Sequence, residues 1–126
     1  MKDLSIIIPA KQEVESLPIV LDEIKNFECD KIVILPPEDN ETINAISKFN
    51  SLKIIKQNSP GVGSAIKQGI SSINTNYFCI LMADGSTDPK YIPQFYELLN
   101  REKLDLVFGS RYEKNDSGSD DDTIVT

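Results

Sequence analysis

The loop MADGSTDP, residues 82–89, places two carboxylates directly after a strongly apolar segment. An aspartate at the position of Asp84 can reach a ligand crevice and hold a divalent cation against a diphosphate, because hard cations prefer oxygen ligands. Ser86 could add a hydroxyl or a bound water, whereas solvation in a loop is the alternative for Asp84. Asp88 has a structural explanation, since it fits the N-cap of a helix that begins with Pro89.

A second loop, SPGVGSAIKQG, places Gly61 and Gly63 before the start of a helix. Glycines at such a position let an anion approach the backbone amides of a helix N-terminus closely. The segment is not a Walker loop, because no Lys-Ser/Thr pair ends it and the GxGxxG spacing is absent. Lys67 follows on the helix, where it could be a simple surface charge. A turn before an ordinary helix is the alternative for the whole segment.

Two further loops contribute charged candidates. Glu13 in PAKQE could accept hydrogen bonds from a base or a ribose, or could occupy the first turn of a helix, where the macrodipole favours an acid. Arg111 directly follows the apolar segment LDLVFGS, and its guanidinium fork suits a phosphate group. Neither residue decides the function by itself.

Composition excludes several kinds of chemistry. The 126-residue chain contains no histidine, which excludes Ser-His and Cys-His nucleophile pairs and His-based zinc sites. Its formal net charge of −7 argues against a nucleic-acid partner, which would require a basic surface. Two cysteines, Cys29 and Cys79, are too few for a disulfide framework and indicate reduced thiols in a cytoplasmic protein. Any chemistry must therefore use carboxylates, Lys or Arg, backbone groups and hard metal ions.

The elements that position these loops alternate between β-rich and amphipathic segments. Apolar runs predict strands at residues 4–9, 31–35, 52–56, 77–82 and 104–110. Helical spacing predicts helices at about residues 13–27, 40–49, 62–73 and 89–99. The first helix is expected to bury Val14, and the third to turn Ile66 and Ile70 inward. The alternation predicts an α/β fold with a mostly parallel sheet and helices on both faces. Such sheets bind ligands outside the carboxyl ends of their strands.

Residues 1–112 are expected to form the N-terminal portion of one domain, and residues 113–126 an acidic polar loop or tail. The last four residues, TIVT, begin an apolar segment, so the chain is expected to be truncated there. No apolar run approaches the roughly 20 residues that a membrane-spanning helix requires.

Taken together, SIIIPAKQE, GVGSAIKQG, MADGSTDP and DLVFGSRY resemble the motifs of family 2 glycosyltransferases in their order and separations. The most similar subgroup is the polyprenol-phosphate sugar transferases of the dolichol-phosphate mannose synthase type. The resemblance implies a GT-A fold, in which a Rossmann-like sheet binds a GDP- or UDP-linked nucleoside diphosphate sugar with Mg²⁺ or Mn²⁺. It also implies transfer with inversion to an acceptor such as a polyprenyl phosphate, and peripheral association with the cytoplasmic face of a membrane.

By this resemblance, Pro9, Lys11 and Glu13 match the segment that lines the nucleobase and ribose. Ala83 and Asp84 match the end of the family's Asp-x-Asp motif, in which Asp84 would hold the metal on the diphosphate.

Four further residues are assigned by the same resemblance. Ser86 falls where some members place another metal-side ligand, and Lys67, in the helix after the glycine-containing loop, is expected to contact the nucleotide sugar. Arg111 matches the arginine of a Gly-Ser-Arg-Tyr segment that faces phosphate, so Asp84 and Arg111 are the implied catalytic residues. Asp39, in PPEDNE, could substitute for the acidic stretch that the family places after the second strand and so contact the nucleotide sugar.

Three departures from the family pattern occur, and Met82 and the Pro36-Pro37 loop support an alternative. Met82 replaces the first aspartate of Asp-x-Asp, Pro36 and Pro37 change the path of the loop after the second strand, and Gln12 replaces an asparagine. The alternative function is therefore a catalytically degenerate GT-A module that binds a nucleotide or a protein partner.

Overall fold

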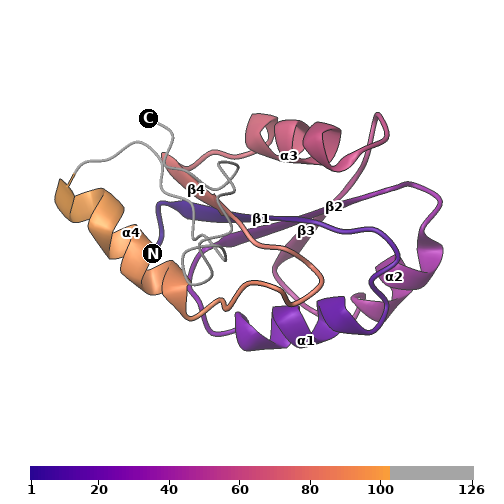
Figure 1. The fold of residues 1–126 in the computed structure, drawn as a ribbon, viewed down its shortest axis with the longest axis horizontal. Helices are drawn as coiled ribbons and strands as arrows, with labels where there is room; N and C mark the ends of the chain where they lie inside the picture. The colour runs from indigo at the N-terminus through magenta and orange to yellow at the C-terminus, as the bar shows by residue number, and fades with distance from the viewer. Residues whose placement is uncertain (103–126) are drawn as a thin grey trace, which may run out of the picture.

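The computed structural model describes residues 1–102, in which strands and helices alternate along the chain (Figure 1). The elements are β1 (Leu4–Pro9), α1 (Ser16–Glu23), β2 (Asp30–Leu35), α2 (Asn40–Ala45), β3 (Leu52–Lys56), α3 (Val62–Ser71), β4 (Tyr77–Ile80) and α4 (Tyr91–Glu102). The predicted fifth strand at 104–110, Arg111 and the acidic segment 113–126 lie outside the described residues.

The described strands form one sheet in the order β3-β2-β1-β4, and every neighbouring pair is parallel. In the register, Ile7 of β1 lies opposite Ile32 of β2 on one side and Ile80 of β4 on the other. The chain adds β2 and β3 on one side of β1 and then returns to add β4 on the other side. The order therefore reverses between β1 and β4, which is where open α/β sheets leave a ligand crevice.

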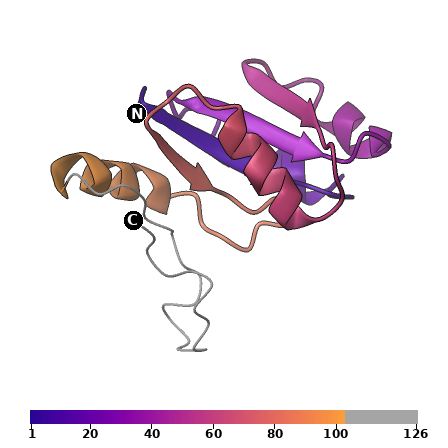
Figure 2. The same ribbon diagram turned by 90° about the horizontal axis from the view of Figure 1, so that it is seen from above.

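Helices cover both faces of the sheet, as the alternating pattern predicts. Figures 1 and 2 show α1, α2 and α4 on one face and α3 on the other. Because side chains alternate along a strand, Ile6 and Ile8 pack into the cluster that contains Leu17 of α1. Ile7 points the opposite way and packs with Ala65 of α3. This confirms the predicted α/β class and explains why β1 is buried along its whole length.

The inward face of α3 differs from the prediction. Ala65 and Gly69 are its buried residues, whereas Ile66 is only partly buried and Ile70 is 40 % exposed. A Cβ atom at Gly69 would come within 2.8 Å of side-chain atoms of Ile7 and Ile34. The small residues therefore face the sheet, because they let the helix axis approach it closely.

Some helix boundaries also differ from the prediction. The first helix begins at Ser16, later than predicted, so Val14 precedes it and stays 39 % exposed. The second ends at Ala45. The last begins at Tyr91, because the carboxylate of Asp88 accepts a 3.0 Å hydrogen bond from the amide of Lys90 and so closes a turn before the helix.

Both cysteines are free, as expected, and Cys79 is buried in β4. Across residues 1–102, no helix combines the length and the apolar character needed to cross a bilayer.

Candidate functional site

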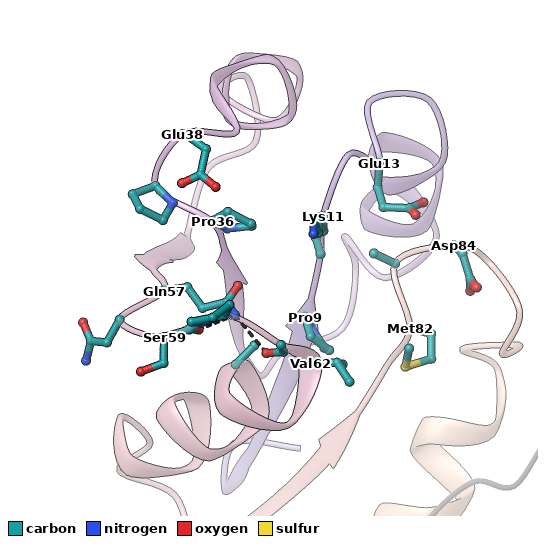
Figure 3. A pocket seen from close by; sticks show the side chains of 17 residues that line it. Pro9, Lys11, Glu13, Pro36, Glu38, Gln57, Ser59, Val62, Met82 and Asp84 are labelled. Carbon is teal, nitrogen blue, oxygen red and sulfur yellow. Dashed lines mark hydrogen bonds between the residues drawn. The ribbon is translucent and has the colours of Figure 1, made fainter.

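A cavity of about 510 Å³ lies at the carboxyl ends of the four strands (Figure 3). This is within the size range of small-molecule sites, about 300–1,000 Å³. Each strand contributes the loop that follows it. The walls are Pro9 at the end of β1 with Ala10, Lys11 and Glu13 after it, Pro36, Pro37 and Glu38 after β2, residues 57–62 after β3 with Ala65 of α3, and Met82, Ala83 and Asp84 after β4.

Five of the predicted site residues line this one cavity, and they come from the two strands that flank the point of reversal. They are Pro9, Lys11, Glu13, Ala83 and Asp84. Figure 3 shows Glu13, Met82 and Asp84 on one side, Glu38 and Pro36 on the other, and Pro9 and Lys11 between them. The parallel topology thus brings together loops that are about seventy residues apart in sequence.

Three other predicted residues do not line the cavity. Lys67 is an exposed residue in the second turn of α3. Ser86 contacts Asp84 through its backbone, since its amide donates a 2.9 Å hydrogen bond to Oδ1 of Asp84. Asp39 lies at the start of α2. Arg111 is outside the described residues.

Asp39 connects two of the loops at the cavity. Its Oδ2 accepts a 2.6 Å hydrogen bond from the amide of Gln12, and its Oδ1 accepts one of 3.3 Å from the amide of Thr42, as an N-cap residue does. Partial desolvation, the largest single influence, raises the pKa of the Asp39 carboxyl. The hydrogen bonds from Gln12 and Thr42 outweigh it and lower that pKa below its ordinary value.

The loop between β3 and α3 is closed by Gln57. Its Nε2 donates to the carbonyl oxygens of Ser59 at 2.7 Å and Gly61 at 2.9 Å. Gly61 has a φ of 100°, which a residue with a side chain rarely adopts. No side chain caps α3, so the amides of its first turn are left at the cavity wall, where an anionic group could accept hydrogen bonds from them.

Sequence reasoning did not assign Glu38 or Gln57 to the site, although both line the cavity. The sequence signal that could have identified them is their place in the loops that follow β2 and β3, because such loops lie at the ligand-binding edge of a parallel sheet. Strand ends alone could not show which of the side chains in those loops face the ligand space.

The charged groups of the cavity wall are unbalanced. Lys11 is the single cationic side chain among the lining residues, against the three carboxylates of Glu13, Glu38 and Asp84. Glu13 also accepts a hydrogen bond from the hydroxyl of Ser16, so its carboxylate is fixed near the start of α1. A strongly anionic ligand would bind here more readily with an accompanying cation.

A divalent cation fits this wall only if the ligand supplies part of the coordination. No group of three or more Asp, Glu, Cys or His side chains that could enclose a metal occurs within residues 1–102. Mg²⁺, however, is usually held by one or two carboxylates together with substrate phosphates and waters. Asp84, which is exposed at the cavity, meets that requirement.

A parallel α/β sheet with a cavity at the reversal of its strand order is the arrangement in which open α/β domains bind their ligands. Residues 5–123 match the family model described as glycosyl transferase family 2, and the chain belongs to this family.

Similar proteins agree with this membership. The chain is 26 % identical over 108 residues to uncharacterized glycosyltransferases of Mycobacterium bovis and of two Mycobacterium tuberculosis strains. The match covers 86 % of this chain and 48 % of each relative, so the chain spans about half their length.

A solved structure supports the predicted GT-A fold. The crystal structure of Staphylococcus aureus TarS, residues 1–349, superposes with a TM-score of 0.64 at 12 % identity. The superposition covers 82 % of this chain and 33 % of TarS. At this identity the likeness establishes the fold alone.

Proposed function

We propose that this chain forms the donor site of a glycosyltransferase, which moves a sugar from a nucleoside diphosphate sugar to an acceptor. The observation that carries the proposal is the cavity where loops from all four described strands meet. Its volume of about 510 Å³ suits a nucleotide-sized ligand. Family membership supports a donor of the nucleotide-sugar class.

Metal assistance is the second part of the proposal. The lining side chains carry one cation and three carboxylates, so a diphosphate would meet repulsion unless a cation accompanied it. Asp84 would hold Mg²⁺ or Mn²⁺ on the diphosphate. When bound, the ion would neutralise the charge that develops on the leaving diphosphate. Lys11 would contribute a further positive charge from the neighbouring loop.

The acceptor and the stereochemistry rest on the resemblance to polyprenol-phosphate sugar transferases. A phosphate acceptor is already ionised and needs no dedicated general base, which agrees with a chain that has no histidine. A single in-line displacement at the anomeric carbon would give inversion. Arg111 is proposed to contact phosphate of the donor or acceptor, and a peripheral position at the cytoplasmic membrane face would bring a polyprenyl phosphate within reach.

The donor site can be tested by thermal-shift titration with GDP- and UDP-sugars, each with and without Mn²⁺. We expect one nucleotide class to raise the melting temperature of the wild-type chain, and the rise to depend on the metal. Asp84→Asn should abolish the metal-dependent part.

Asp88→Asn is the matched control for this substitution. Asp88 accepts a hydrogen bond from the amide two residues on at 3.0 Å, just as Asp84 does at 2.9 Å, but it does not line the cavity. The control should therefore bind like the wild type. If Asp84→Asn and Asp88→Asn behave alike, Asp84 does not hold the metal.

A catalytically degenerate module is the second candidate. Met82 places a thioether in the cavity wall where the family has a carboxylate, and this favours weaker metal binding. Nucleotide stabilisation that is the same with and without Mn²⁺ would support this candidate over the transferase.

A further inference from the structure

We propose that Asp39 and Thr42 act as positioning residues that hold the segment 11–13 in its donor-binding conformation. Together with the amides of Gln12 and Glu13 they form a contact that we call the interloop latch. This inference rests on the proposed function. It assigns Asp39 a role behind the cavity wall in place of direct contact with the nucleotide.

The interloop latch joins two consecutive amides to two side chains at the start of α2, those of the N-cap Asp39 and of Thr42. The amide of Gln12 donates to Oδ2 of Asp39 at 2.6 Å, and the amide of Glu13 donates to Oγ1 of Thr42 at 3.2 Å. The two acceptors are fixed to each other, because Oδ1 of Asp39 accepts from the amide of Thr42 at 3.3 Å. The loop after β1 is thereby fastened to the start of α2, some thirty residues away in sequence.

The fastened segment has an unfavourable backbone conformation at its centre. Gln12 has a φ of 55°, in the left-handed region that a side-chain-bearing residue seldom occupies. Such a conformation persists where surrounding contacts determine it. The latch supplies those contacts at Gln12 itself and at the next residue.

The residues on either side of Gln12 are the ones that face the ligand space. Lys11 and Glu13 line the cavity, whereas Gln12 and Asp39 do not. A left-handed residue between them redirects the chain, so the orientation of both side chains depends on it. Loss of the latch would let this residue return to a common conformation and move Lys11 and Glu13 away from the cavity.

The burial of Thr42 and the charge of Asp39 strengthen the hydrogen bonds of the latch. Thr42 is fully buried, so an unpaired hydroxyl or amide there would lack water as a substitute partner. Both oxygens of Asp39 already accept backbone amides, and bonds to an ionised acceptor are stronger than neutral ones. Both carboxylate oxygens of Asp39 thus bind backbone amides, one in the loop after β1 and one in the first turn of α2.

Two variants separate the latch from the helix cap. Asp39→Asn keeps a side chain that can cap α2, since Asn and Asp are about equally good N-caps, but it removes one of the two acceptor oxygens. Thr42→Val keeps the branched shape and removes the hydroxyl acceptor. Thr42→Ser retains the hydroxyl and serves as the conservative rescue. Asp22→Asn, at an exposed ion pair with Lys25, controls for the loss of one charge.

Two measurements are made on each variant of the full chain. Amide hydrogen exchange at Gln12 and Glu13 reports the latch, and titration with GDP- and UDP-sugars in the presence of Mn²⁺ reports donor affinity. We expect Asp39→Asn and Thr42→Val to speed exchange at these amides and to raise the donor Kd, each by about tenfold, the size of one hydrogen bond. Thr42→Ser and Asp22→Asn should resemble the wild type in both.

The outcomes distinguish this inference from the proposed function. Unchanged exchange at Gln12 and Glu13 would overturn the latch whatever the affinity. Faster exchange with an unchanged donor Kd would overturn the positioning role. A wild-type chain that binds no nucleotide under any condition would overturn the proposed function and the positioning role with it.

Discussion

A Cβ atom on Gly69 would lie 2.8 Å from Cδ1 of Ile34, which shows how closely α3 packs on the sheet. The same atom would lie 2.8 Å from Cγ2 of Ile7 in the central strand. The Ile34 atom ends a flexible side chain, but Cγ2 of Ile7 is attached at a branched Cβ with few alternative rotamers. This closeness therefore requires glycine at position 69, and it sets the distance between α3 and the sheet.

Gly69→Ala should destabilise the fold. The added methyl has to displace Ile7 or lift α3, and overpacking of this kind costs about 1–3 kcal/mol. Urea denaturation gives the free energy of unfolding. Gly63→Ala is the matched control in the same helix, because a Cβ there meets no atom within 4 Å. Since Ala is a better helix former, the control should be neutral or stabilising by up to about 1 kcal/mol. Equal stability of the two variants would contradict the packing argument.

Met82→Asp should strengthen metal-dependent donor binding. The residue lines the cavity two positions before Asp84, so a carboxylate there adds an oxygen ligand and a charge near the ion. In a thermal-shift titration with the nucleotide sugar present, the Mn²⁺ concentration at half-maximal stabilisation should fall about tenfold. Met82→Asn gives the same size without the charge and should change little. A variant that binds Mn²⁺ no better than the wild type would place the metal elsewhere.

Gln57→Glu should loosen the loop between β3 and α3. The substitution keeps the shape of the side chain but replaces the donor that reaches the carbonyls of Ser59 and Gly61. Because these hydrogen bonds are exposed, their loss should lower the free energy of unfolding by about 0.5–1.5 kcal/mol and weaken nucleotide binding. The same substitution at Gln94, which is exposed on α4, is the control and should leave both unchanged. An unchanged free energy of unfolding in Gln57→Glu would mean that the hydrogen bonds of Gln57 to Ser59 and Gly61 do not stabilise the loop.

The free energy of unfolding should decrease at alkaline pH in part because of Cys79. Burial, with a smaller contribution from Cys29, raises the pKa of the Cys79 thiol from 9.0 to about 12. Below pH 9 the thiol is protonated in both states and adds no pH dependence. At higher pH the unfolded chain loses this proton while the folded chain keeps it, so stability falls as pH rises.

Cys79→Val removes this thiol at similar volume. We expect the variant to lose less stability than the wild type between about pH 7 and about pH 10 in denaturant titrations. The difference between the two free energies of unfolding at neutral pH measures the effect of the substitution on packing alone. Parallel losses in the two proteins would show that the thiol does not contribute.

Much of the fold could be predicted because local patterns determine it. The segment Leu4–Pro9 is almost entirely apolar and does not alternate with polar residues, as expected for a strand buried on both faces, and the structure confirms it. The alternation of strands and helices predicted the α/β class, because each apolar strand needs helices to cover both faces of the sheet. Ile70 shows where pattern reasoning fails. Helical spacing predicted that Ile70 faces the sheet, but the residues of α3 that pack against the sheet are Ala65 and Gly69.

Part of the candidate site was also determined by the sequence. Asp84 and Glu13 were assigned because loops that follow parallel strands meet at one edge of the sheet, and both do line the cavity. Their roles as ligands stay predictions. The family motifs placed these residues along the chain, but they contained no information on how far apart the loops lie in space.

The tertiary structure alone decided which residues share the cavity and which support it. The order β3-β2-β1-β4 places the loop after β4 beside the loop after β1, and no local pattern encodes that order. It also brings Asp39 to the amide of Gln12, 27 residues away. A hydrogen bond of this kind depends on the register and twist of two strands, so it exists only once the chain has folded.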